Sequence, residues 1–235
     1  DTLRVLQECF HNLTTGRLGP VWLSVPVDVQ SMQVPDVLEE WSPPQEVLMT
    51  SLPQEFLDVW SNSKRPIVLA GNGIHLSKTK EKFKKFLDRH QLPYVVSFFG
   101  SDLGDDYTGK TGLIGNRAGN FAIQNADLIL CLGSRLSKSI TGYKRTLFGR
   151  EAKVVYLDID TSEFIPEKKL DIQLHMDLKT FFNLELPSIT PDTTWISKNK
   201  EWKDLWEEEL PERSGPLVCP YRHLNTFFKE KPGNA

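Results

Sequence analysis

The chain has 235 residues, with 28 Lys or Arg against 31 Asp or Glu, so its formal net charge is −3. This balance disfavours a mainly electrostatic nucleic-acid binder, and no apolar run approaches the roughly 20 residues that cross a bilayer. The cysteines Cys9, Cys131 and Cys219 show no metal-ligand spacing. We therefore expect no membrane or nucleic-acid partner, no structural zinc site or disulfide framework, and a reducing, cytoplasmic location.

The first 30 residues show a helical pattern followed by a short strand pattern. Apolar residues recur at helical spacing from Leu3 to Leu13, and Gly16 ends the helix. Residues 21–26 form an apolar run that predicts a buried strand. One helix and one strand cannot enclose a core, so residues 1–30 are predicted to be the end of a larger domain.

The middle of the chain alternates between strand and helix patterns. Residues 31–63 contain prolines that interrupt every helical run, which is typical of a linker. Residues 64–186 contain apolar runs predicted as strands at 66–70, 93–97, 128–132, 154–158 and 172–175, with helices at 78–90, 118–125 and from 178. This alternation indicates an α/β domain with a Rossmann-like parallel sheet and helices on both faces.

The last part of the chain is predicted to be a second linker and the start of another domain. Residues 187–219 are rich in proline and contain a helical pattern with Trp195, Trp202, Leu205 and Trp206 on one face. We expect this face to pack on a neighbouring domain. Residues 220–235 begin a further helix, so the whole is interpreted as an internal segment of a longer polypeptide.

Parallel sheets of this kind bind ligands beyond the carboxyl ends of their strands. That rule selects the loops at 71–73, 97–100, 133–135 and 158–160. Gly71-Asn72-Gly73 follows a strand and lacks the Cβ atoms that would keep the backbone away from a phosphate. The pattern fits a nucleotide loop and, equally, a tight turn between strand and helix.

Charged residues follow two of the other predicted strands. Arg135 could pair either with a phosphate or with a nearby carboxylate. Of Asp158 and Asp160, one could accept a hydrogen bond from an adenosine ribose while the other caps the next helix. No zinc, nucleophile-elbow or Walker motif is visible, so we assign no catalytic residue and no metal ligand to this chain.

Several segments together resemble the thiamine-diphosphate enzymes of the acetolactate synthase type. The segment 19–30 reads GPVWLSVPVDVQ, which resembles the end of the pyrimidine-binding domain of that family. The central domain of the family is resembled by RPIVLAGNG at 65–73, ADLILCLGSR at 126–135, TG at 141–142 and VVYLDID at 154–160. The resemblance covers essentially the whole chain.

The resemblance implies a parent enzyme that uses thiamine diphosphate and Mg²⁺, decarboxylates a 2-oxo acid and transfers the acyl group to an acceptor. The family's activating Glu would precede Asp1 and its GDG…N motif would follow Ala235, so this segment is expected to be non-catalytic by itself. Its expected partners are the flanking domains of the same polypeptide, and its expected assembly is a homodimer or a tetramer.

In the synthases the central domain also holds FAD, and other branches hold ADP or nothing. By motif position the groove would be lined by Gly71, Asn72, Gly73, Gly133, Ser134, Arg135, Asp158 and Asp177. Two departures from the family pattern stand out. Residues 136–139 replace the usual acidic pair, and Met176 replaces a glycine before Asp177. The alternatives are therefore a stand-alone FAD- or ADP-binding module and a structural spacer with an empty groove.

Overall fold

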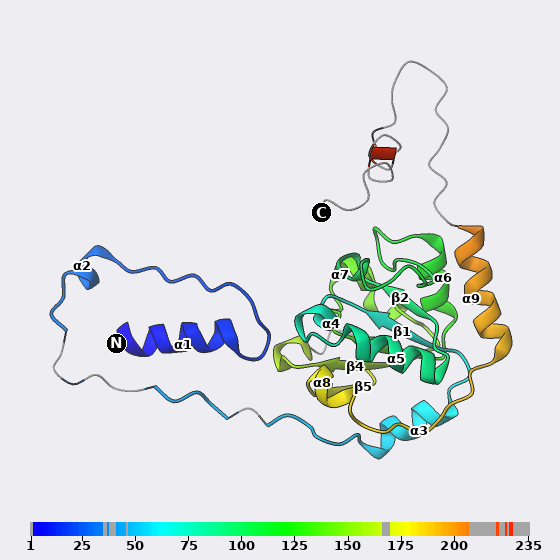
Figure 1. The fold of residues 1–235 in the computed structure, drawn as a ribbon, viewed down its shortest axis with the longest axis horizontal. Coiled ribbons are helices and arrows are strands. Elements are labelled where there is room, and N and C mark those ends of the chain that lie inside the picture. The colour runs from blue at the N-terminus through cyan, green and yellow to red at the C-terminus, as the bar shows by residue number, and fades with distance from the viewer. Residues whose placement is uncertain are drawn as a thin grey trace.

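The computed structural model describes residues 2–34, 37, 41–45, 47–165, 170–206, 220, 224, 226 and 227 (Figure 1). Its centre is a five-stranded sheet in which every pair of neighbouring strands is parallel. The strand order is β2-β1-β3-β4-β5. The strands are β1 (Pro66–Ala70), β2 (Tyr94–Val96), β3 (Leu128–Leu132), β4 (Lys153–Asp158) and β5 (Ile172–His175). The predicted parallel sheet is confirmed.

Alternate residues of each strand point to opposite faces of the sheet. Helices cover both of these faces. Val68 and Leu130 face one core, together with α3 (Gln54–Asn62), α5 (Lys80–His90) and α8 (Leu178–Phe181). Ile67 and Ile129 face the other core, together with α6 (Arg117–Asn125) and α9 (Thr193–Leu205). Burial on both faces explains why each strand reads as a continuous apolar run.

The helix boundaries follow from local backbone chemistry. The helix expected from residue 78 begins instead at Lys80, because Lys78 adopts a left-handed φ of 57° that ends the preceding turn. Polar side chains cap three later helices by accepting a backbone N–H. These caps are Asn116 for α6, Asp177 for α8 and Asp192 for α9.

A short helical turn follows each strand at the same edge of the sheet. The turns after β1 and β3 are α4 (Gly73–Leu76) and α7 (Lys138–Thr141), the latter succeeded by the 3-10 turn η2 (Arg145–Leu147). The turns after β2 and β4 are η1 (Phe98–Gly100) and η3 (Thr161–Glu163), and α8 follows β5. This edge is therefore built from strand ends and short helical turns.

The region predicted as a linker at 31–63 contains α3, which the sequence pattern missed. Pro53 stands directly before the first turn of α3, where a proline is tolerated, so it does not interrupt the helix. Phe56 and Trp60 are buried in the core of the sheet. The Trp60 indole donates a hydrogen bond of 2.9 Å to the Pro187 carbonyl, which joins the two proline-rich regions.

The strand predicted at 21–26 is wrong. These residues are extended but pair with no strand in the described part of the chain, and Trp22 is 92% exposed. A strand needs hydrogen-bonded neighbours, and a lone apolar run does not supply them. The preceding helix is confirmed as α1 (Thr2–Thr14), which buries no residue, and the short α2 (Val27–Gln30) follows.

The predicted tryptophan helix is confirmed as α9, and its neighbour is the central sheet itself. Trp195 and Trp202 are buried beside α6, and Trp206 lies 4.8 Å from Phe121 between ring centroids. Leu205 is 64% exposed and does not share this face. The helix predicted at 221–229 lies largely outside the described residues.

Candidate functional site

A groove of about 1440 Å³ lies at the carboxyl ends of the strands. All five strands contribute to it through the loops that follow them. The chain crosses from one side of β1 to the other between β2 and β3, so the sheet's switch point lies between β1 and β3. Doubly wound sheets bind ligands at this point. The groove is larger than the roughly 300–1,000 Å³ of an ordinary small-molecule pocket, so an extended ligand fits its volume.

The structure brings seven of the eight predicted site residues together around this groove. They are Asn72, Gly73, Gly133, Ser134, Arg135, Asp158 and Asp177. Gly71 does not line it. The rule that ligands bind beyond the strand ends selected six of these seven residues, and the family resemblance supplied Asp177.

The glycines of the first and third loops serve close packing of one loop on the other. The Gly73 N–H donates to the Gly133 carbonyl at 2.8 Å, and the Gly71 N–H donates to the Leu132 carbonyl at 3.0 Å. A Cβ on Gly73 would lie 2.5 Å from the Gly133 Cα, and Gly133 itself has a φ of +60°. Three glycines thus let the backbones of β1 and β3 meet at the switch point.

Two predicted side chains keep polar atoms available to a ligand. Asn72 precedes α4, is exposed and forms no capping hydrogen bond with its side chain. Asp177 is half-buried, and its Oδ1 accepts the Lys179 N–H at 2.6 Å. Its second carboxylate oxygen has no partner in the described ranges.

The end of β4 carries a network of charges in which Asp158 is already well supplied with hydrogen bonds. One carboxylate oxygen accepts the Tyr156 hydroxyl at 2.9 Å. The other accepts Arg17 Nη2 at 2.7 Å and the Asp160 N–H at 3.0 Å. Asp160 in turn accepts the Ser162 N–H at 2.9 Å, which confirms the prediction that one of the two aspartates caps the next helix.

Arg17 holds three carboxylates together and was missed by the sequence analysis. Its guanidinium contacts Asp158, Asp160 at 3.5 Å and Glu163 at 3.4 Å. Burial by itself would lower the pKa of Arg17, but the hydrogen bond and the charge of Asp158 outweigh burial and raise it. Arg17 lies two residues before the GPV segment, yet its partners lie more than 140 residues away in sequence. No local sequence pattern therefore predicted the contact.

Arg135 pairs with a carboxylate of the same network. It forms an ion pair with Glu163, whose side chain is buried, while Arg135 itself is 68% exposed. The sequence left open whether Arg135 pairs with a phosphate or with a carboxylate, and the structure shows the pair with a carboxylate. Arg135 still lines the groove.

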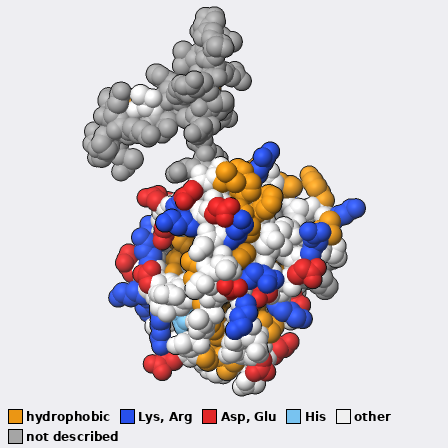
Figure 2. Space-filling view, turned by 90° about the vertical axis from the view of Figure 1, so that its right-hand side faces the viewer, with side chains coloured by type: hydrophobic (Ala, Val, Ile, Leu, Met, Phe, Trp, Pro, Cys, Tyr) orange, Lys and Arg blue, Asp and Glu red, His pale blue; other side chains and the backbone are white. Residues whose placement is uncertain are grey.

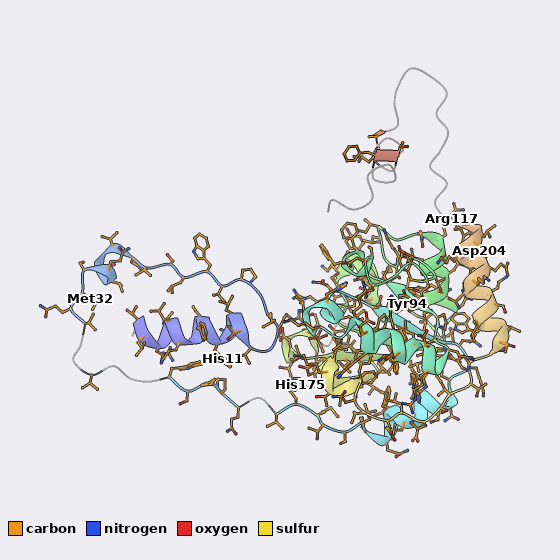
Figure 3. The ribbon with its side chains drawn as sticks, in the orientation of Figure 1. His11, Met32, Tyr94, Arg117, His175 and Asp204 are labelled. Carbon is orange, nitrogen blue, oxygen red and sulfur yellow. The ribbon has the colours of Figure 1, made fainter. Side chains whose placement is uncertain are left out.

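The position of the groove relative to the N-terminal segment is visible in the ribbon views. The turn after α1 lies against the side of the central domain, and residues 14–18 line the groove (Figure 1). His175, at the end of β5, lies on this same side, whereas Tyr94 lies within the domain (Figure 3). The groove is therefore bordered by the N-terminal segment as well as by the sheet.

Each of the two departures from the family pattern places one buried apolar side chain at the groove. Leu136 and Met176 are both fully buried, and both line the groove.

The described residues contain no group of three or more His, Cys, Asp or Glu that could hold a metal ion. Within the same ranges, no helix has the length and apolar character needed to span a bilayer.

Comparison with known proteins relates the chain to one family. The sequence model of the thiamine pyrophosphate enzyme central domain matches residues 54–184, which include all five strands. The acetolactate synthase large subunit of Lactococcus lactis is 32% identical over 86% of this chain and 37% of its own length. Acetolactate synthase 1 of Nicotiana tabacum is 28% identical over 100% of this chain and 38% of its own length.

An archaeal relative shows the same partial coverage. The probable acetolactate synthase large subunit of Methanocaldococcus jannaschii is 27% identical over 83% of this chain and 36% of its own length. The chain thus spans less than two fifths of the length of these relatives. Because the family match covers more than half of the chain and coincides with the observed sheet, the chain belongs to the thiamine pyrophosphate enzyme central-domain family.

Proposed function

We propose that this chain is part of a thiamine diphosphate-dependent enzyme similar to acetolactate synthases. Such an enzyme would decarboxylate a 2-oxo acid and transfer the remaining acyl group to an acceptor. The observation that carries the proposal is the family match over 54–184, supported by relatives named acetolactate synthase. Thiamine diphosphate, when bound, supplies the electron sink for decarboxylation.

In this proposal the described residues scaffold the enzyme and bind a ligand, and they do not carry the reaction. They offer no ligand cluster for the Mg²⁺ that accompanies the diphosphate, so none is assigned to that cofactor. We propose that residues 1–30 and 220–235 belong to the neighbouring pyrimidine-binding and diphosphate-binding domains, which are joined to the central domain by linkers. A cytoplasmic homodimer or tetramer is part of the same proposal.

The groove at the β1–β3 switch point would hold a nucleotide, either FAD or ADP. Its volume of about 1440 Å³ suits an extended ligand, and it lies at the switch point where the glycine loops after β1 and β3 meet. Asp158 does not fit the role of ribose acceptor, because Arg17, Tyr156 and a backbone N–H occupy its oxygens. The unpartnered oxygen of Asp177 is better suited to accept a hydroxyl hydrogen bond.

A structural spacer with an empty groove is the second candidate function. The pairing of Arg17 and Arg135 with the acidic residues after β4 favours it, since both arginines are engaged without a ligand. The buried Met176 also fills space at the position where the family resemblance implies a glycine. These contacts would stabilise the domain whether or not a nucleotide binds.

Two measurements test the proposal. The full-length gene product, incubated with thiamine diphosphate, Mg²⁺ and pyruvate as the 2-oxo acid, should release CO₂ only when thiamine diphosphate is present. Absence of CO₂ release from pyruvate and from other short 2-oxo acids would contradict the enzymatic proposal. Equilibrium dialysis with FAD and with ADP should show binding of at least one of them. If neither FAD nor ADP binds, the result would favour the second candidate function, a structural spacer with an empty groove.

A further inference from the structure

A second hollow continues the groove where the chain runs from β3 to β4. This basic pocket has a volume of about 770 Å³ and is lined by Lys138, Tyr143, Lys144, Arg145, Thr146 and Ile165. Three of these residues, Lys138, Arg145 and Ile165, also line the groove. We infer that the basic pocket binds the phosphate groups of a phosphorylated ligand whose body lies in the groove.

Among the residues that the structure describes, no acidic side chain pairs with the cations of the basic pocket. Half of its lining side chains are basic, and none of the described lining residues is acidic. Within the described ranges, Lys138, Lys144 and Arg145 form no ion pair. Arg17 and Arg135, in contrast, are already paired with carboxylates on the β4 side of the groove. Of the groove-lining cations without an ion pair in the described ranges, Lys138 and Arg145 lie at the end next to α7 and η2, and Lys179 lies in α8.

The backbone that carries these cations is fixed from both sides. The Leu113 N–H donates to the Ser139 carbonyl at 2.7 Å, which ties α7 to the loop before α6. The Gln124 side chain donates to the Leu147 carbonyl at 3.0 Å, which ties η2 to α6 itself. A site whose backbone is held before the ligand arrives loses less entropy on binding.

The chemistry of the lining suits phosphate. Arg145 is half-buried and can donate two parallel hydrogen bonds to one phosphate group, while Lys138 and Lys144 are exposed and act as mobile point charges. Tyr143, 81% exposed on the same lining, adds a hydroxyl donor. A guanidinium group that can donate two hydrogen bonds, with flexible lysine side chains around it, is well matched to a diphosphate.

The charge of the basic pocket is unusual for this molecule. The whole chain has a formal net charge of −3. On the face that carries α9, basic and acidic side chains are interspersed (Figure 2). The described lining of this shallow hollow carries only positive charges, so it attracts anions locally against this background. It also includes Lys138, which lies in the stretch 136–139 that departs from the acidic pair of the related synthases.

The inference rests on the proposed nucleotide groove but is tested separately from it. The variant Lys138→Gln/Arg145→Gln removes the two cations shared by the groove and the basic pocket. The matched control Lys85→Gln/Arg89→Gln removes the same charge from the exposed face of α5. ADP and inorganic pyrophosphate are titrated into the wild type and both variants by calorimetry, and circular dichroism verifies that each variant is folded.

We expect the pocket variant to bind ADP and pyrophosphate about tenfold more weakly than the wild type or worse, because charge-assisted hydrogen bonds are lost. The control should bind both as the wild type does. Equal ADP affinity in the wild type and the pocket variant would overturn the inference while the nucleotide groove stands. Pyrophosphate binding that depends on Lys138 and Arg145, with no added affinity for ADP, would support the pocket and contradict the nucleotide groove.

Discussion

Two apolar runs of similar composition adopt different structures in this molecule, since one forms a buried strand and the other forms no strand. Residues 67–70 lie in β1 and are at most 1% exposed, whereas residues 21–26 form no strand, and Trp22 among them is 92% exposed. The difference is the neighbourhood, since β1 pairs with β2 and β3 and is covered by helices on both faces. An apolar run becomes a strand only where other strands accept its hydrogen bonds.

The largest expected effect separates a tryptophan of the sheet region from a tryptophan of the N-terminal segment. Trp60→Ala should lower the free energy of unfolding by about 3–5 kcal/mol, because it leaves a cavity and removes the hydrogen bond to Pro187. Trp22→Ala should change it by less than about 0.5 kcal/mol, because the side chain is exposed. Urea unfolding followed by circular dichroism measures both, and equal losses would contradict the comparison.

The second prediction concerns the close contact at the switch point. Gly133→Ala should cost about 2–4 kcal/mol, because its Cβ would lie 2.7 Å from the Gly73 Cα and its φ is +60°. Gly142→Ala is the matched control, since Gly142 also has a positive φ but no atom within 4 Å of the added Cβ. It should cost only about 1–2 kcal/mol. Similar losses in the two variants would show that the loops do not pack as described.

The third prediction tests the contact that joins the two regions. Arg17→Ala should cost about 1–3 kcal/mol, because the nearly buried Asp158 loses its cationic partner. Arg17→Lys should lower the free energy of unfolding by less than Arg17→Ala does, because lysine keeps the positive charge. It does not replace the arginine fully, because an ammonium group cannot contact three carboxylates at once. Hydrogen exchange at the end of β4 should accelerate in Arg17→Ala. Unchanged exchange and stability would mean that the N-terminal segment is not held to the sheet by this arginine.

The smallest effect is a dependence on pH within the sheet region. His90 is buried against Trp60 and Phe86, and its Nδ1 has no hydrogen-bond partner among the residues that the structure describes. Burial, assisted by the charge of Arg89, lowers the pKa of His90 below its ordinary value of 6.5. As the pH decreases, His90 therefore binds a proton in the unfolded chain at a higher pH than in the folded chain. The free energy of unfolding should fall as the pH decreases below about 6.5.

The variant His90→Leu isolates this pH dependence. It removes the titrating group while keeping an apolar side chain against the two aromatic rings. The difference in unfolding free energy between wild type and variant should shift in favour of the variant between pH 7.5 and pH 5.5, measured by urea unfolding. A difference that is independent of pH would contradict the assignment of a neutral, buried imidazole.

The sequence predicted the sheet well because its signal is local. Each strand buried on both faces is a continuous apolar run, and each run lies between helical patterns, so five strands and their parallel arrangement could be inferred. The helix α3 was missed because Pro53 and its neighbours suggested interruption, whereas Pro53 precedes the helix. The strand at 21–26 was predicted from the same local signal that worked for β1, without the pairing partners that decide the outcome.

The groove was predictable in outline, whereas its charge network was not. The strand-end rule, which depends only on topology, selected six of the lining residues that we named, and the family resemblance added Asp177. The contact of Arg17 with Asp158 joins positions 141 residues apart, and the Arg135–Glu163 pair depends on how η3 turns after β4. Such contacts are products of tertiary structure and leave no pattern in a single sequence.

Hydrogen–deuterium exchange of the wild-type protein, with and without ADP, tests the central claim that the β1–β3 switch point is a nucleotide site. The account predicts slower exchange at residues 72–74 and 133–138 when ADP is present, with α1 unchanged. Absence of any change, or slower exchange only at residues outside the groove, would contradict it.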